Sequence, residues 1–254
     1  MKRLVALFFL FIFMLSLTFG PNAQNLLAAT NDELYSFTTK DGEPALYDHA
    51  NKAYVVKAWT ADGKEISLSE YKSIIEGSNK LNTQNAITLA PSENQKTNQQ
   101  VEKINALNYI NMNYYEKDLT WAATATPQKV SPSVDCPSWQ PAPCPVQVTD
   151  SVQSSESFST GVDAGDKNYI RVNAGFTWQE TSQSQVGVTY QIPLGQRGYV
   201  TFAPYFNHTR GYIHYAYSDQ SGYHYLGKSK MKFAQSPKVL SNGLADGVYS
   251  VVKY

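Results

Sequence analysis

Few residues in this chain could carry acid–base or metal chemistry. There are four histidines, and three of them, His208, His214 and His224, are close enough in sequence to be considered as metal ligands. Imidazole is a common ligand of transition metals in proteins. A hairpin over residues 211–225, however, would not place His214 and His224 opposite each other. We therefore favour exposed strand histidines among tyrosines, with no metal and no other cofactor.

Two acidic residues are the other candidates for catalysis. A glycosidase needs two carboxylates at a defined separation, and Glu156 and Glu180 are the available pair. Sequence spacing does not fix their separation. The chain has no Gly-x-Ser-x-Gly nucleophile elbow, no His-Glu-x-x-His zinc motif and no phosphate-binding glycine-rich loop. We therefore predict no catalytic residues and a protein that is not an enzyme.

Cys136 and Cys144 are the only two cysteines of the chain. An even number of cysteines favours a disulfide bond in a secreted protein, and the N-terminal segment described below predicts secretion. Three prolines stiffen the short loop that this bond would close, and the loop carries Trp139. Two interpretations of Trp139 stay open. It is either an aromatic finger that binds a glycan, a lipid headgroup or a partner, or a side chain that packs back onto the sheet.

Tyrosine is frequent, with 18 residues in the chain, and eight of them fall between positions 190 and 225. Exposed aromatic rings could stack against the sugar rings of a glycan. The same tyrosines could equally form cross-strand aromatic pairs in an ordinary sheet. An extracellular glycan- or cell-wall-binding module that uses exposed Tyr and Trp is therefore the alternative to the function developed below.

The charge balance excludes some partners. Lys and Arg together number 21, Asp and Glu also number 21, and charged residues make up 17% of the chain. Nucleic-acid-binding surfaces are strongly basic, so no nucleic acid partner is predicted. A strongly polycationic membrane binder is excluded for the same reason.

The N-terminus has the pattern of a secretory signal peptide. Lys2 and Arg3 precede an apolar run over residues 4–19, and Gly20-Pro21 and several small residues follow it. We predict a signal peptide over residues 1–29 and a secreted, extracellular protein. An uncleaved N-terminal anchor is the alternative, because the apolar run approaches the length that spans a bilayer.

The rest of the chain divides into three segments. Residues 30–77 combine strand-like runs with the capping box Ser67-x-x-Glu70 ahead of a short helix over 68–76, which predicts a small α+β unit. Residues 78–103 are rich in Asn and Gln and have no aromatic residue, which predicts a polar linker or mobile loop. The third segment is residues 104–254.

Alternation of apolar and polar residues dominates the third segment. Apolar residues fall only on even positions between 146 and 164, and again from 168 to 192 apart from Tyr169. A period of two is typical of strands with one apolar face. Later strands are predicted at 199–206, 211–218, 223–232 and 248–254. The predicted fold is mainly β, an elongated antiparallel sheet or sandwich with a small N-terminal α+β unit.

One predicted hairpin of this segment, centred on residues 163–168, resembles a membrane-insertion element. Its two strands would place these apolar side chains on one face: Phe158, Val162, Ala164, Ile170, Val172, Ala174 and Phe176. A Ser/Thr/Gln-rich hairpin with an apolar tip, followed by a Ser/Thr-rich strand that runs into Ile192-Pro-Leu-Gly195, is similar to aerolysin-type pore-forming proteins. The resemblance covers residues 130–235.

The resemblance implies a secreted, non-enzymatic, toxin-like β-protein that forms a homo-oligomer on a target membrane. Lipid offers no hydrogen bonds to an open backbone, so insertion requires several hairpins that close into a barrel. The N-terminal unit and the loop between Cys136 and Cys144 depart from the pattern of that family. The expected partner is a target membrane or, for the alternative function, a cell-surface glycan.

Overall fold

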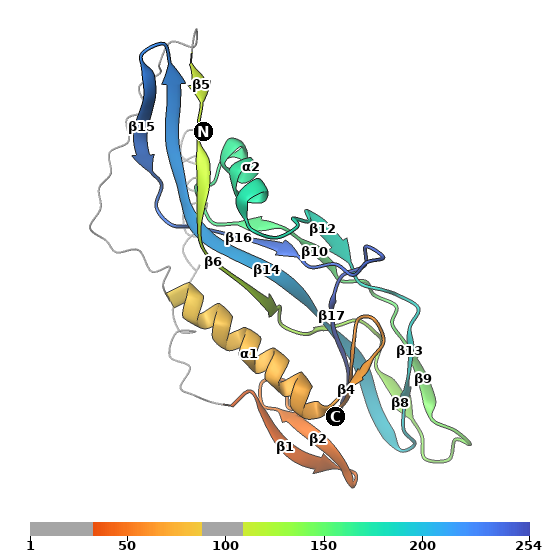
Figure 1. Ribbon diagram of the computed structural model, residues 1–254. Coiled ribbons are helices and arrows are strands. Elements are labelled where there is room, and N and C mark those ends of the chain that lie inside the picture. The colour runs from red at the N-terminus through yellow and green to blue at the C-terminus, as the bar shows by residue number, and fades with distance from the viewer. Residues whose placement is uncertain (1–32, 88–108) are drawn as a thin grey trace, which may run out of the picture. The chain divides into compact units, whose positions relative to one another are not determined.

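The computed structural model describes residues 33–87 and 109–254 (Figure 1). The signal peptide predicted at 1–29, and the part of the predicted linker from 88 to 103, lie outside these residues. The structure is mainly β, with 51% strand and 14% helix. The strand pairs of the described residues are antiparallel, so the predicted mainly β, antiparallel fold is confirmed. No helix in these ranges is both long enough and apolar enough to cross a membrane.

Thirteen strands form one sheet, in which the main hydrogen-bonded order is β1–β2–β3–β17–β14–β16–β11. The strands on this path are β1 Tyr35–Lys40, β2 Glu43–Asp48, β3 Ala53–Thr60, β17 Gly247–Lys253, β14 Gln196–Asp219, β16 Lys232–Pro237 and β11 Ser157–Phe158. The others are β4 Glu65–Ile66, which pairs with β3, and β5 Ile110–Asn111, β6 Tyr114–Thr124, β7 Gln128–Lys129, β8 Val134–Cys136 and β15 Gly222–Lys228, which pair with β14.

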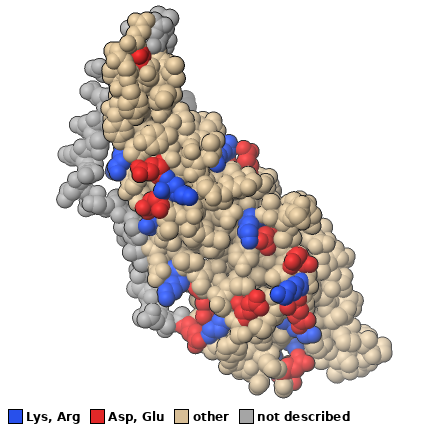
Figure 2. Space-filling model, in the orientation of Figure 1, with Lys and Arg blue, Asp and Glu red and all other residues tan. Residues whose placement is uncertain are grey.

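Two smaller sheets and two helices complete the described structure. The small sheets pair β10 Gln153–Ser155 with β12 Thr181–Gln183, and β9 Cys144–Gln147 with β13 Thr189–Ile192. The helices are α1 Leu68–Ile87 and α2 Ala164–Asn173. Figure 2 shows basic and acidic side chains interspersed over much of one face, which agrees with the even charge balance of the sequence.

Strand β14 connects most of these elements. It is 24 residues long, so the strands predicted at 199–206 and 211–218 are one continuous strand. Its first part pairs with β17, and its later part pairs with β6, β16 and β15. At about 3.3 Å per residue the strand extends through roughly 80 Å of backbone. Side chains at its two ends are therefore remote from each other.

A glycine lets β14 pass close to β6. The register between the two strands shifts between Arg210 and Gly211, which marks a β-bulge. A Cβ atom at position 211 would lie 2.1 Å from the carbonyl oxygen of Glu116 and 2.8 Å from the ring of Tyr115. Only glycine permits so close an approach of two backbones.

The N-terminal strands join the sheet built by the C-terminal half. β3 pairs with β17, so residues 33–66 contribute to the same sheet as the third sequence segment. Their apolar side chains, including Leu46 and Val55, form a core cluster with Tyr71 and Ile75 of α1 and with Val248 of β17. The described residues from Leu34 to Tyr254 accordingly form one compact unit.

Helix α1 begins where the capping box predicts it. The Ser67 hydroxyl accepts a hydrogen bond from the backbone N–H of Glu70 at 3.1 Å. The helix does not end at residue 76, however, but continues to Ile87. The prediction of a linker is therefore wrong for residues 78–87.

Polar side chains in the second half of α1 explain this difference, because they bond to β6. The hydroxyl of Ser78 accepts from the backbone N–H of Thr124 at 2.9 Å, and the Trp121 indole N–H donates to Asn82 Oδ1 at 3.2 Å. These partners lie about forty residues further along the chain. The sequence of the segment shows only its polarity, not the contacts that order it.

The bond from Thr124 to Ser78 gives a test of this docking. Ser78→Ala should lower the free energy of unfolding by about 1–3 kcal/mol, because a buried backbone N–H loses its acceptor. Urea unfolding followed by circular dichroism measures the change. Thr83→Ala, on the exposed side of the same helix, is the matched control and should leave stability within about 0.5 kcal/mol. Equal effects of the two substitutions would contradict the docking role.

Candidate functional site

Residues 153–183 begin and end in one small two-stranded sheet, and we call them the excursion. Its two ends form a stem, in which β10 and β12 pair with Gln153 opposite Gln183 and Ser155 opposite Thr181. The stem continues one step further, because the backbone N–H of Glu156 donates to the carbonyl oxygen of Glu180 at 2.7 Å. The excursion is therefore a closed loop that is held at its base by antiparallel pairing.

The middle of the excursion is a helix, so the predicted hairpin centred on residues 163–168 is wrong. Asp163 is the N-cap of α2, and its side chain accepts from the backbone N–H of Asp166 at 2.8 Å. Gly175 follows the helix with a φ of +86°, where a Cβ would clash with Lys117. Capping and packing on the sheet outweigh the alternation that suggested a strand.

The seven apolar side chains assigned to that hairpin consequently differ in burial. Val172 is 82% exposed, whereas Ile170 is fully buried. Of the remaining five, Ala174 is buried, Ala164 is exposed, and Phe158, Val162 and Phe176 are half-buried. Of the seven, only Phe158 and Val162 pack against the buried cluster that Ile170 forms with Tyr115, Ile213 and Ala234. This cluster is separate from the two larger core clusters.

An ionic clamp closes the base of the excursion. Arg171 of α2 donates two hydrogen bonds to the carboxylate of Glu156, one of them at 3.0 Å from Nε, and its Nη1 lies 3.1 Å from Glu180 Oε1. The Trp178 indole N–H donates to Glu156 at 2.6 Å. Although partial burial opposes it, the bonds from Arg171 and Trp178 lower the pKa of Glu156 below its usual value.

The two carboxylates named as glycosidase candidates are thus brought together on one guanidinium group. A general acid in a glycosidase needs a raised pKa. Glu156 has the opposite shift, and Arg171 occupies the space between it and Glu180. The arrangement is that of a structural ion pair. One feature of the sequence points to this ion pair, since Arg171 is the only charged residue on the polar face of the strand predicted over residues 170–178.

Aromatic rings and β16 hold the outer part of the excursion. Trp178 stacks on Phe158 and on Phe176, with ring centroids 5.6 Å apart in both pairs. The backbone of β11 pairs with β16, and the Ser236 hydroxyl bonds to both backbone groups of Gln179. The excursion therefore rests on the sheet through an edge strand and one aromatic layer.

Two buried hydroxyl groups in the stem have no partner. Ser154 and Ser182 face each other across β10 and β12, and neither hydroxyl is hydrogen-bonded within the described residues. A buried polar group without a partner costs about 1–3 kcal/mol. The stem is therefore less stable than its regular backbone hydrogen bonding implies.

A groove lies beside the excursion, and sequence reasoning missed it. It has a volume of about 410 Å³ and is lined by Asn82, Asn85, Trp121, Ser157, Phe158, Ser159, His208, Phe233, Ala234 and Gln235. Trp121 and His208 form its stacked aromatic part, with centroids 4.9 Å apart. Burial lowers the pKa of His208 to about 4, so this histidine is neutral at physiological pH.

The three histidines considered as metal ligands do not converge. His208 stacks on Trp121, His214 bonds to Glu116 and to the Tyr225 hydroxyl, and His224 bonds to Asp219. Across residues 33–87 and 109–254, no three His, Cys, Asp or Glu side chains are grouped as metal ligands. The structure confirms that His214 and His224 are not opposite each other, since His224 lies opposite Tyr217 and His214 opposite Lys228.

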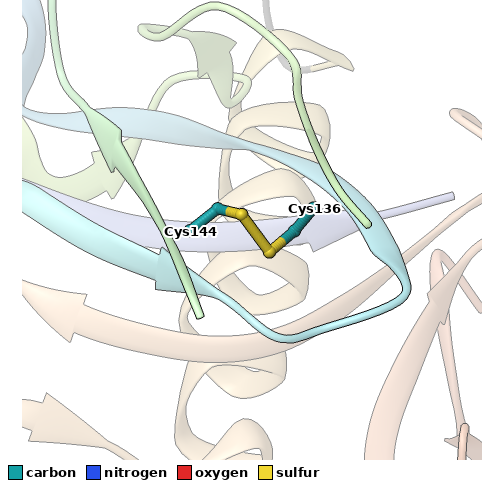
Figure 3. Close-up of a disulfide and its surroundings, with 2 residues drawn as sticks. All are labelled: Cys136 and Cys144. Carbon is teal, nitrogen blue, oxygen red and sulfur yellow. A yellow bond between two sulfur atoms is a disulfide. The ribbon is translucent and has the colours of Figure 1, made fainter. Parts of the chain in front are cut away.

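The disulfide bond between Cys136 and Cys144 is present, with 5.5 Å between the Cα atoms (Figure 3). Cys136 is buried in the core cluster that includes Val146 and Ile192, so the bond ties β8 and β9 to the start of β14. Trp139 in the closed loop is 77% exposed. Of its two interpretations, packing back onto the sheet is therefore wrong.

The eight tyrosines between 190 and 225 do not form one surface. Tyr190 packs against Trp59 and Tyr249, and Tyr205 lies beside the N-terminal core cluster. Tyr223 and Tyr225 are more than half exposed, at the end of β14 that is remote from Trp139. Most of these rings are ordinary sheet residues, and the exposed ones gather at one end.

Comparison with known proteins gives one match. The chain matches a family of unknown function, DUF6060, over residues 108–254, and it belongs to that family. No curated protein and no solved structure matches it. The matched range begins just before β5 and includes the excursion, the disulfide loop and all of β14.

The ionic clamp predicts a pH-dependent stability. Because the pKa of Glu156 is lower in the folded protein than in the unfolded chain, its carboxylate stabilises the fold above the ordinary glutamate pKa. That stabilisation is lost as the pH falls through the folded-state pKa. Arg171→Gln should therefore lower the free energy of unfolding at neutral pH, and the difference from wild type should shrink in acid.

Urea unfolding measured from neutral pH to about pH 3 tests this dependence. Lys230→Gln, which removes the same charge from an exposed side chain, is the matched control and should shift stability little at any pH. A deficit of Arg171→Gln that stays constant over the whole pH range would contradict the role of the clamp.

Proposed function

We propose that the protein is exported and membrane-active, and that the excursion enters a lipid bilayer as an extended β-hairpin. The observation that carries the proposal is the register of the stem. With Gln153 opposite Gln183, continued pairing would place every even position opposite another even position. Phe158 would then face Trp178, and Val162 would face Ala174.

Continued pairing would give the excursion two strands of the length that spans a bilayer. Residues 156–166 would pair with 170–180, and a transmembrane strand needs about 9–11 residues. One face would carry all seven apolar side chains of the predicted hairpin together with Trp178 and Thr160, and its charged residues, Glu156, Asp166 and Glu180, would lie at the ends of the two strands. The other face would carry only Ser, Thr, Asn, Gln, Gly, Asp163 and Arg171. Apolar and polar faces in this arrangement suit lipid on one side and water on the other.

The folded excursion already contains part of this register. Phe158 and Trp178, which continued pairing would place opposite each other, are stacked in the structure. Between them and the stem lies the backbone bond from Glu156 to Glu180. The change that the proposal requires is therefore the release of β11 from β16 and of the segment around α2 from the sheet.

The contacts that hold α2 are limited in number. Withdrawal of Ile170 from its cluster costs about 1.5–3 kcal/mol, and the bonds of Arg171 must break. A helix of this length has little stability by itself in water. Lipid would bury Val172, which is 82% exposed in the folded protein, and would take up the other apolar side chains again. Because a lone hairpin leaves open edges, several copies must close into a barrel.

A designed disulfide bond tests the proposal. Ser157 and Gln235 are antiparallel partners in β11 and β16, where Cβ atoms are about 4.5–5.5 Å apart. Ser157→Cys with Gln235→Cys should lock the excursion to the sheet. The oxidised variant should release no dye from lipid vesicles, and mild reduction should restore release, because the locked segment cannot leave β16.

Two controls make this result specific. Gln147→Cys with Thr189→Cys joins β9 to β13 outside the excursion, and the oxidised protein should release dye as wild type does. Wild type treated with the same reductant shows the effect of opening Cys136–Cys144. Unchanged release by the oxidised lock would refute the proposal. So would the absence of release by wild type from vesicles of phosphatidylcholine, with or without cholesterol, and of bacterial lipids.

Glycan binding through Trp139 is a second candidate function. It is supported by the exposure of this indole on a loop that three prolines and a disulfide constrain. Trp139→Ala should then weaken retention on purified peptidoglycan or on a glycan array at least about tenfold. Phe37→Ala, which removes an exposed aromatic ring from β1, is the control. Equal retention of the two variants and wild type would reject this function.

A further inference from the structure

The end of β14 forms a three-stranded ribbon with β5 and β15, and we call residues 109–114 and 217–226 the aromatic tip. β15 lies along one side of β14, and β5 lies along the other. Six large apolar or aromatic side chains of the tip are 44–69% exposed: Ile110, Met112, Tyr114, Tyr223, Tyr225 and Leu226. A concentration of exposed apolar side chains of this kind marks an interaction surface.

The charge of the tip restricts its partner. Residues 109–114 and 217–226 contain no Lys and no Arg, and Asp219 is their only acidic residue. Asp219 is held in the turn by the side chain and backbone N–H of Ser221 and by His224. Figure 2 shows this end of the sheet almost without charge in that view. The surface has nothing to attract a phosphate, an anionic lipid or an acidic glycan.

Most of the exposed side chains of the tip, among them Ile110, Tyr114 and Tyr223, share one face of the ribbon, and Tyr109 is exposed on the other face. Tyr223 and Ile110 are cross-strand partners of Ser218, so they share its face. Tyr217 alternates with Ser218 and lies on the opposite face, where Tyr109 packs on it with centroids 5.8 Å apart. A flat protein or a sugar ring would cover only one of these faces. A fluid interface surrounds the end of a ribbon and covers both.

We infer that the aromatic tip docks the protein on the interface of a neutral, zwitterionic membrane such as phosphatidylcholine. Tyrosine suits this location because its ring enters the apolar boundary while its hydroxyl stays among headgroups and water. Ile110, Met112 and Leu226 supply apolar area that a glycan would leave uncovered. The inference deepens the proposed function and rests on it for the identity of the target, a lipid membrane.

The two ends of β14 make different kinds of surface, which supports this assignment. At the other end, the disulfide loop exposes Trp139 beside several prolines. At the tip, the exposed groups are neutral, and several of them are aliphatic. The excursion packs on β6 and β14 next to the tip, because Ile170 of α2 belongs to one cluster with Tyr115 and Ile213. The neighbouring residues Tyr114 and His214 stack on each other on the opposite face of the sheet. A docked tip would therefore hold the excursion near the lipid.

Flotation with phosphatidylcholine vesicles tests the inference. The full mature chain carrying Ile110→Ser, Tyr223→Ser and Leu226→Ser should partition to the vesicles at least about tenfold more weakly than wild type. All three side chains are more than half exposed, so the variant should keep the circular dichroism spectrum and unfolding midpoint of wild type. Phe37→Ser, which removes a 61% exposed ring from β1, is the matched control and should float as wild type does.

Additional measurements distinguish a lipid membrane from other partners of the tip. Added phosphatidylserine and changes in salt should not alter the flotation of wild type, because the tip has no cation. Flotation that requires a glycolipid would assign the tip to a glycan and overturn the inference. Concentration-dependent dimerisation that the triple variant abolishes, without flotation of wild type, would assign it to a second copy and also overturn the inference.

The same experiment separates this inference from the proposed function. The oxidised Ser157→Cys and Gln235→Cys protein should float as wild type does and yet release no dye. Flotation of the triple variant at the wild-type level would overturn docking by the tip and leave the locking result unaffected. Loss of flotation by the triple variant together with full release by the oxidised lock would overturn the role of the excursion and leave the docking surface in place.

Discussion

The structure depends on the uninterrupted backbone hydrogen bonding of β14. Seven strands of the described chain pair with this one strand, and each of the three core clusters contains residues from it. Because the strand is 24 residues long, its side chains pack in three separate core clusters. The strand has a close contact at Gly211 and bulges in its pairing with β6 and with β15. Val200 and Ile213 are fully buried in different clusters of the same strand. Remote functions can thus share one scaffold.

Polar residues inside β14 explain why the sequence suggests two strands rather than one. Residues 207–211 look like a break because they are polar and end in glycine. In the structure the Thr209 hydroxyl and the Tyr115 hydroxyl are 3.0 Å apart, and Arg210 donates to Asp118 at 2.7 Å. These partners come from β6, more than ninety residues earlier. Alternation and turn residues predict strands and their antiparallel pairing well, but they carry no information about such distant partners. The second half of α1 was missed for the same reason.

The candidate site was predicted in part. The disulfide follows from two cysteines in one short segment, but the prolines around Trp139 do not decide whether this side chain is exposed or packs on the sheet. The excursion was located correctly, but its middle was assigned to the wrong element, because one sequence carries two patterns there. Even positions are apolar as in a strand, yet Asp163 and Gly175 supply the cap and the stop of a helix. Local capping, the clamp at Arg171 and packing of Ile170 decide between the patterns in the folded chain. The spacing of apolar and polar residues in the sequence predicts neither the ionic clamp nor the packing of Ile170.

The coexistence of these two patterns limits what can drive a change at the excursion. Binding shifts a conformational equilibrium only by the difference in affinity between the two states. The proposed docking would use side chains of the aromatic tip that do not contact α2, so docking alone would raise the local concentration of lipid without favouring release of α2. The difference in affinity for lipid must come from the excursion itself, above all from Val172 and the half-buried rings that stack on Trp178. Against it stand the Arg171 clamp and the buried Ile170. The proposed docking and the proposed conversion would therefore be separable steps, carried by different residues of the chain.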